Sequence, residues 1–168
     1  MIEVLSVEID GGFNAVCAPE EICRRAIEDH RAISALYVAG NRSRVIGKVR
    51  GKLNVRRAFT VHQLIEILLE SYEEAIFVEH DALIFEECDF PTLKDLIMLL
   101  RQIGTERTVF YFTCCRDRVF DLITKMADRY VYVERDVNGY YIADVSCNGF
   151  RQLFCPKSAQ LTLEAFPG

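Results

Sequence analysis

Short apolar runs alternate with segments of helical periodicity along most of the chain. The apolar runs have the length and the nearly unbroken hydrophobicity of strands that are buried on both faces of a parallel sheet. They lie at 13–17, 33–39, 75–78 and 108–113. Apolar residues at helical spacing follow each run, at 17–25, 61–71, 91–104 and 117–127. This alternation predicts consecutive αβ units in a layered α/β domain.

Helix start and stop signals support these boundaries. Thr60 and Gln63 form a capping box in front of the segment that contains Leu64 and Leu68. Pro91 stands where the third helix begins, and Gly104 stands where it ends. The signals therefore agree with the periodicity.

The last forty residues have a different pattern. Residues 129–135 and 140–145 alternate around Asn138-Gly139, a strong hairpin signal, and Asn148-Gly149 offers a second turn before 150–154. We therefore expect a three-layer α/β sandwich with a mainly parallel central sheet and a C-terminal antiparallel β-meander. It forms a single domain over 1–168, with an αβ core at 13–127 and the antiparallel extension at 128–168.

Composition narrows the class of protein. A chain of 168 residues with 51% apolar residues is long enough for one autonomous core, and its apolar runs are too short to span a membrane. No leader pattern opens the sequence, so we expect a cytoplasmic protein without membrane contact. The seven cysteines and three histidines have no metal-ligand spacing, and we expect free thiols and no bound metal.

Charge divides the middle of the chain into two segments. Residues 30–65 contain eight basic residues and no acid, whereas 58–93 contain nine acids and no Lys or Arg. The protein should therefore have a strong electrostatic asymmetry. Basic and acidic segments on different molecules could pair, so a homo-oligomer is one expectation.

Three ordered stretches resemble the RecA/RadA-type recombinase superfamily. Residues 53–63, LNVRRAFTVHQ, look like the strand-to-helix stretch that precedes the Walker B strand of archaeal RadA and its eukaryotic counterparts. Residues 75–85, AIFVEHDALIF, are similar to the Walker B stretch, and 121–135 resemble the helix and strand that follow the second DNA-binding loop. The resemblance covers most of 13–154 and implies a RecA-like ATPase core.

The same resemblance places a phosphate loop of the type G-x-x-x-x-G-K-[ST] at 17–24, where this chain reads CAPEEICR. Cys17 and Ile22 replace the glycines, Cys23 replaces the lysine and Arg24 replaces the hydroxyl residue. Glu20 and Glu21 would lie near the triphosphate and repel it. Pro followed by two acids is also an ordinary way to begin a helix. The resemblance therefore implies a degenerate paralogue that lacks the phosphate loop.

Other positions of the implied ATPase site are changed too. The acid that would polarise water is missing after the second strand, where the chain reads Ala39-Gly40-Asn41, and the γ-phosphate sensor is replaced by Thr113-Cys114-Cys115. Glu79 stands at the Walker B aspartate position and could reach a magnesium ion through water. As the polar end of a buried strand, Glu79 needs no catalytic explanation. We expect neither ATP hydrolysis nor a cofactor.

Cys114 and Cys115 admit a second kind of chemistry. Arg116 and Arg118 follow them and could lower the thiol pKa values. No histidine is placed by the sequence to act as a base. The simpler interpretation is that Cys114 and Cys115 are small apolar side chains at the end of a strand, without a chemical role.

The basic run is the candidate nucleic-acid surface. Its residues lie between positions 42 and 57 without an intervening acid, and the two segments that correspond to recombinase DNA loops, 86–91 and 114–117, are acidic or short. The candidate residues are Arg42, Arg44, Lys48, Arg50, Lys52, Arg56 and Arg57. They could contact single-stranded DNA weakly and without sequence preference, form a solvated loop and edge strand, or dock to an acidic protein surface.

These expectations combine into one functional hypothesis. The sequence favours a catalytically inactive RecA/RadA-like paralogue that acts as a binding or regulatory module in DNA recombination or repair. Its expected partners are a RadA-type recombinase or other ATPase, or single-stranded DNA. The alternatives are a diverged ATPase-like protein that still binds a nucleotide, and a regulatory subunit of another ATPase assembly without nucleic-acid contact.

Overall fold

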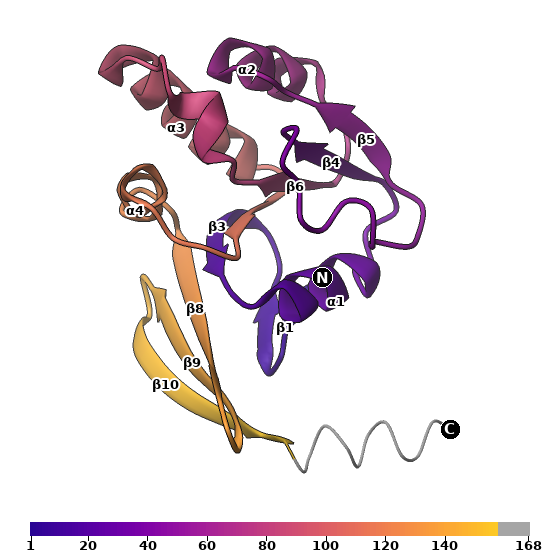
Figure 1. The fold of residues 1–168 in the computed structure, drawn as a ribbon, viewed down its shortest axis with the longest axis vertical. Coiled ribbons are helices and arrows are strands. Elements are labelled where there is room, and N and C mark those ends of the chain that lie inside the picture. Colours follow the sequence, from indigo (N-terminus) through magenta and orange to yellow (C-terminus); the bar gives the residue numbers. More distant parts are fainter. Residues whose placement is uncertain (158–168) are drawn as a thin grey trace.

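An eight-stranded sheet forms the centre of the structure, a computed structural model that describes residues 1–157 (Figure 1). The strand order is β10-β9-β8-β3-β7-β6-β4-β5. A separate two-stranded hairpin of β1 and β2 lies at the N-terminus. The strands are β1 (Ile2–Val4), β2 (Val7–Ile9), β3 (Gly12–Cys17), β4 (Ala35–Ala39), β5 (Asn54–Arg57), β6 (Ala75–Glu79), β7 (Thr108–Thr113), β8 (Arg129–Asp136), β9 (Gly139–Ser146) and β10 (Gly149–Pro156).

Helices cover the two faces of the sheet unequally. The α-helices are α1 (Glu20–Glu28), α2 (Val61–Glu70), α3 (Phe90–Gly104) and α4 (Arg118–Thr124), and η1 (Ala82–Phe85) is a 3-10 helix. One hydrophobic core lies between the sheet and α2, α3, α4 and η1. The second core lies between the opposite face, α1 and the β1–β2 hairpin. The predicted three-layer α/β sandwich is confirmed.

Strand direction changes along the sheet. β3, β7, β6, β4 and β5 are parallel, as the αβ alternation predicts. β8 also pairs with β3 in parallel, and β9 and β10 then continue in antiparallel order. A mainly parallel sheet with a C-terminal antiparallel meander is therefore present. The last part of the predicted extension, 158–168, lies outside the described residues.

Side-chain caps fix the helix starts that the sequence indicates. Thr60 Oγ1 accepts the Gln63 backbone N–H at 3.2 Å, and Gln63 Oε1 accepts the Phe59 N–H at 2.7 Å. Asp89 caps α3. At its other end, α3 packs closely on β3. Only glycine fits at position 104, since a Cβ there would lie 2.6 Å from the Phe13 backbone nitrogen.

Several predicted boundaries were wrong. β4 begins only at Ala35, and Ile33 is 98% exposed. α4 covers Arg118–Thr124 rather than 117–127, because Asp117 caps its first turn and 125–128 form a turn and bend.

The β1–β2 hairpin in the first nine residues was not predicted from the sequence. Ile2, Val4, Val7 and Ile9 are buried beside α1, and the tight turn places Leu5 at a φ of 54°. This hairpin completes the layer that contains α1. Within residues 1–157, no helix has the length and apolar character that crossing a membrane requires.

Candidate functional site

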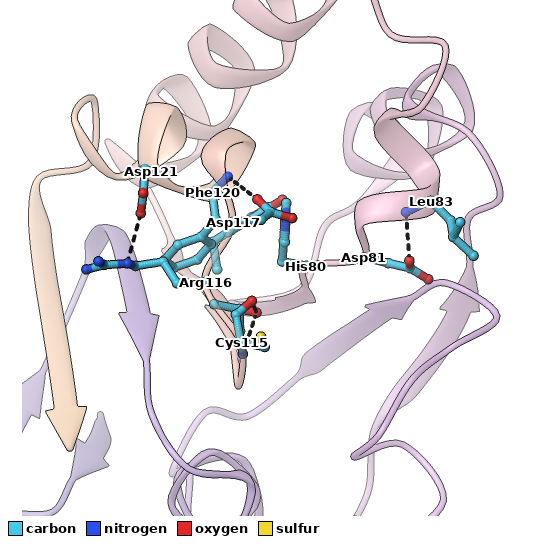
Figure 2. Close-up of polar contacts among 10 residues, drawn as sticks. His80, Asp81, Leu83, Cys115, Arg116, Asp117, Phe120 and Asp121 are labelled. Carbon is cyan, nitrogen blue, oxygen red and sulfur yellow. Dashed lines mark hydrogen bonds and ion pairs between the residues drawn. The ribbon is translucent and has the colours of Figure 1, made fainter. Parts of the chain in front are cut away.

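The carboxyl ends of the parallel strands meet at one edge of the sheet, the place where open α/β sheets usually bind ligands. A cleft of about 360 Å³ opens there between the loop after β4, the start of η1 and the β7–α4 connection. It is lined by Arg42, Arg44, 79–83 and 113–117. Figure 2 shows the part of this cleft formed by the ends of β6 and β7. It is the candidate functional site.

Glu79 ends β6 and is 7% exposed. Its Oε2 accepts hydrogen bonds from Tyr37 Oη at 2.6 Å and from Ser43 Oγ. Its Oε1 accepts the backbone N–H of Arg44 at 3.0 Å. Burial and the Glu79 charge raise the pKa of Tyr37, so its hydroxyl stays protonated and donates. Both carboxylate oxygens of Glu79 are therefore engaged in holding the loop after β4 against the sheet.

His80 joins three elements beside Glu79. Its Nε2 lies 2.8 Å from Asp117 Oδ2 and its Nδ1 lies 2.6 Å from Tyr111 Oη, while the ring stacks on Phe85. Burial lowers the pKa of His80, against the opposing effect of Asp117. The neutral ring that donates to Asp117 and accepts from Tyr111 satisfies both contacts. Figure 2 shows the imidazole beside the Asp117 carboxylate.

Asp117 and Asp81 also order the backbone at the cleft. Asp117 Oδ1 accepts the Phe120 N–H at 2.8 Å and starts α4, and Asp81 Oδ1 accepts the Leu83 N–H at 3.0 Å and starts η1 (Figure 2). Asp81 also lies against Gly40, where any Cβ would overlap its carboxylate. Both acids therefore fix the backbone of the two segments that line the cleft, at the starts of η1 and α4.

The first turn of α1 forms the neighbouring end of the sheet edge. Glu20 makes an ion pair with Lys48, and Glu21 makes one with Arg135 and also accepts from Tyr140 Oη at 3.1 Å. The two acids near the helix N-terminus thus bind cations from the loop after β4 and from the meander. They also complement the positive end of the helix dipole.

The other residues of the nucleotide site that the resemblance implied differ in their exposure to solvent. Cys17 and Cys23 are buried, whereas Arg24 is partly exposed. Burial raises the pKa of Cys17 to about 11. Cys17, Cys23 and Cys114 gather where β3, β7 and α1 meet, and Cys115 is exposed at the cleft. The sequence spacing gave no sign that these thiols would lie together.

Metal-binding geometry is absent from the part of the chain that the structure describes. No group of three or more His, Cys, Asp or Glu side chains there is arranged to hold an ion. Arg116, which directly follows Cys115, pairs with Asp121 at 3.3 Å (Figure 2). Its guanidinium also lies over the Tyr132 ring.

The basic run forms an exposed surface from the loop after β4 to the edge strand β5. Lys48 pairs with Glu20, Arg56 lies 3.8 Å from Glu70, and Arg57 donates to the Gly40 carbonyl oxygen at 2.7 Å. The remaining side chains make no ion pair with any residue in 1–157. They are Arg42, Arg44, Arg50 and Lys52. The sequence-predicted surface is thus partly neutralised by α1 and α2.

Among solved structures, the chain is similar to the flagellar accessory protein FlaH from Methanocaldococcus jannaschii. The TM-score is 0.53 with 12% sequence identity, over 80% of this chain and 76% of that chain. This likeness is one of fold, and with the strand arrangement it supports a RecA-like α/β fold.

No protein-family model matches the chain. A curated relative is an uncharacterized protein of Archaeoglobus fulgidus, which is 58% identical over 168 residues. The match covers 99% of this chain and 88% of that protein. Identity at this level over nearly the whole length shows common descent, and the chain belongs to the same family as this archaeal protein.

Proposed function

We propose that this RecA-like chain does not turn over ATP and acts by contact, as a binding or regulatory module in DNA recombination or repair. One observation carries the proposal. The first turn of α1, at the place where the recombinase resemblance implies a phosphate loop, carries Glu20 and Glu21, and both are ion-paired within the chain.

Electrostatics disfavours a triphosphate at this turn. Two like charges about 4 Å apart repel by roughly 4 kcal/mol at an effective dielectric constant near 20. A nucleotide at this turn would also compete with Glu20 for Lys48 and with Glu21 for Arg135. These costs oppose the interaction of phosphate with a helix N-terminus.

The Walker B position supports the same proposal. A magnesium ion needs carboxylate or water oxygens with free lone pairs directed at it. Glu79 uses its two oxygens for Tyr37, Ser43 and the Arg44 amide. A metal bound directly through Oε2 would compete with the Tyr37 and Ser43 hydroxyls, and would weaken the attachment of the loop that follows β4.

The partner we favour is single-stranded DNA, bound through its phosphates. Arg42, Arg44, Arg50 and Lys52 are exposed and have no acidic partner within residues 1–157. Exposed cations without partners attract a polyanion, whereas the surface offers few aromatic side chains for base stacking. Binding should therefore be weak, sensitive to salt and indifferent to sequence.

Nucleotide binding is tested by calorimetry with Mg-ATP. We expect no heat of binding at submillimolar nucleotide, with ADP giving the same result. Submillimolar affinity that disappears in Glu79→Ala, with the fold retained by circular dichroism, would favour the diverged nucleotide-binding alternative.

DNA binding is tested by fluorescence anisotropy with a labelled single strand. The quadruple variant R42Q/R44Q/R50Q/K52Q should lose at least about tenfold in affinity. With four phosphate contacts in the unchanged protein, log affinity should fall against log salt with a slope near −3.

A matched control uses cations of the same surface that already have partners. K48Q/R56Q removes two charges but changes two sites that the Glu20 and Glu70 carboxylates neutralise, so affinity should change less than threefold. Equal losses of binding free energy per removed charge in the two variants would indicate a general charge effect. No loss in the quadruple variant would leave docking to an acidic protein surface as the better explanation.

A further inference from the structure

The meander of β8, β9 and β10 has two unlike faces. Side chains of one face, such as Ile142 and Leu153, pack against the core beside α1. On the opposite face, α4 covers β8, where Phe120 contacts Tyr130. Within residues 1–157, the core beneath α2, α3 and α4 contains no side chain from β9 or β10. Figure 1 shows these two strands at one end of the sheet, beyond α4.

The face of β9 and β10 that lies beyond α4, the meander face, is apolar. Tyr141 is directly opposite Phe154, and Val145 is directly opposite Phe150, so the four side chains point to the same side of the sheet. They are between 41% and 60% exposed. The rings of Tyr141 and Phe154 contact each other, with their centroids 4.9 Å apart. Large apolar side chains gathered in this way mark an interaction surface.

A hollow lies beside the Tyr141 and Phe154 rings. Ala143 is two residues further along β9 and faces the same side, and its small side chain leaves space between larger neighbours. A cavity of about 600 Å³ is lined there by Ala143 together with Tyr132, Tyr141 and Phe154. The meander face thus has a ridge, formed by Tyr141 and Phe154, next to a hollow. Because packed sheets interdigitate their side chains, a ridge beside a hollow is complementary to a second copy of itself after a two-fold rotation.

Charge and area also fit a contact between two copies. The three strands contribute nine side chains to this side of the sheet, and among them only Glu134 is charged. Interface cores are depleted of charge in the same way. The four exposed apolar side chains offer roughly 400 Å² per copy, at about half exposure of side chains of this size. A stable interface buries about 800 Å² per partner, of which about 60% is apolar. The meander face therefore supplies most of the apolar area that a stable dimer needs.

We propose that two copies of this chain associate through the meander face, related by a two-fold axis, with the Tyr141 and Phe154 ridge of each copy in the Ala143 hollow of the other. The contact does not use the basic run, because β10 and β5 are the opposite edges of the sheet. It therefore stands apart from the proposed DNA binding, and each dimer carries two basic surfaces.

The first experiment is sedimentation velocity of the full chain between about 1 and 100 µM. We expect a species with twice the mass of one chain at the highest concentration. Its dissociation constant should change less than threefold in 1 M NaCl, because salt screens charges and does not weaken apolar contacts. Pairing between basic and acidic segments of two copies would instead be lost in salt. A monomer at 100 µM, or a dimer that dissociates in 1 M NaCl, would overturn the proposal.

Two variants test the ridge and the hollow separately. Ala143→Leu fills the hollow without removing apolar area, and Phe154→Thr removes half of the ridge. Each should weaken the dimer at least about tenfold, with the fold checked by circular dichroism. Phe90→Gln is the matched control, because Phe90 is also exposed but begins α3, away from the meander, and the change should alter the dissociation constant less than twofold. A dimer that either meander variant leaves unchanged, or that F90Q weakens equally, contradicts the assignment.

A second measurement uses the unchanged protein and does not depend on the folding of any variant. Amide hydrogen exchange at about 1 µM and 100 µM compares the monomer with the dimer. Exchange over 139–156, which spans β9 and β10, should slow at least about fivefold at the higher concentration, because packing on a second copy suppresses local opening. Exchange in α2 should stay the same. Equal rates in the meander at both concentrations would rule out this face as the contact.

Discussion

The first turn of α1 and the end of β6 carry acids at neighbouring points of the same sheet edge, but the two places use their acids differently. Glu20 and Glu21 are partly exposed, and each pairs with a side-chain cation on another element, while Glu21 also accepts from the Tyr140 hydroxyl. Glu79 is buried, and its partners are two hydroxyls and a backbone amide. Exposed ion pairs contribute little to stability, whereas buried acceptors are costly to remove. Glu20 and Glu21 thus mainly balance surface charge, whereas Glu79 contributes to the stability of the fold.

The largest effect should come from Glu79→Ala. This change leaves the buried Tyr37 hydroxyl and the Arg44 N–H without their acceptor, so the free energy of unfolding should fall by about 3 kcal/mol. Urea unfolding measures the loss. Glu66→Ala on the exposed face of α2 is the control and should change stability by less than about 0.5 kcal/mol. Similar values for the two variants would contradict the distinction between the two places.

An intermediate effect should appear as pH dependence at the end of β6. Burial lowers the pKa of His80, so between its folded value and the ordinary value near 6.5 the unfolded chain binds more protons than the folded protein. Stability is therefore highest above pH 6.5 and falls as the pH falls. The loss is bounded at about 2 kcal/mol between pH 6.5 and pH 5, since one pH unit corresponds to about 1.4 kcal/mol.

His80→Gln should flatten this part of the pH profile in thermal melts between pH 7 and pH 5. Asp117, Asp81 and Tyr111 face the imidazole and should be kept unchanged. Burial also lowers the pKa of His30, so H30Q should flatten a further part in the same direction. Exposed His62 is the control position. A profile that H80Q leaves unaltered would show that acid destabilisation arises elsewhere.

The smallest effect should come from the first turn of α1. Glu20→Gln or Glu21→Gln removes one surface ion pair, and each change should cost no more than about 1 kcal/mol in low salt. The cost should shrink in 1 M salt because screening weakens exposed pairs. Chemical denaturation by urea at two salt concentrations measures this. A loss as large as that of Glu79→Ala would mean that the Lys48 and Arg135 contacts hold α1 in place.

Local signals in the sequence were sufficient for most of the fold. The Thr60 and Gln63 cap, the Pro91 start and the apolar runs act over a few residues, and the structure contains the helices and strands that they predict. The predicted strand start at Ile33 was wrong, because nothing in the local sequence shows that an apolar residue just before a strand is exposed. The β1–β2 hairpin was not predicted, because its turn contains neither the Gly nor the Asn that usually marks a hairpin.

The candidate site was less predictable because its contacts are tertiary. Glu20 and Lys48 are 28 positions apart, and Glu21 and Arg135 are 114 apart. The recombinase resemblance implied a degenerate phosphate loop at 17–24, but no pattern in the sequence could indicate which cations would pair with Glu20 and Glu21.

The contact between Asp81 and Gly40 also limits how this family can evolve. The recombinase resemblance implies a catalytic acid just after the second strand, and Gly40 lies at that end of β4. Any side chain there would begin with a Cβ that overlaps the Asp81 carboxylate, which itself caps η1. A mutation that introduced an acid at position 40 would therefore be deleterious unless position 81 had already changed. Substitutions at positions 40 and 81 would therefore have to occur in a fixed order, with position 81 changing first.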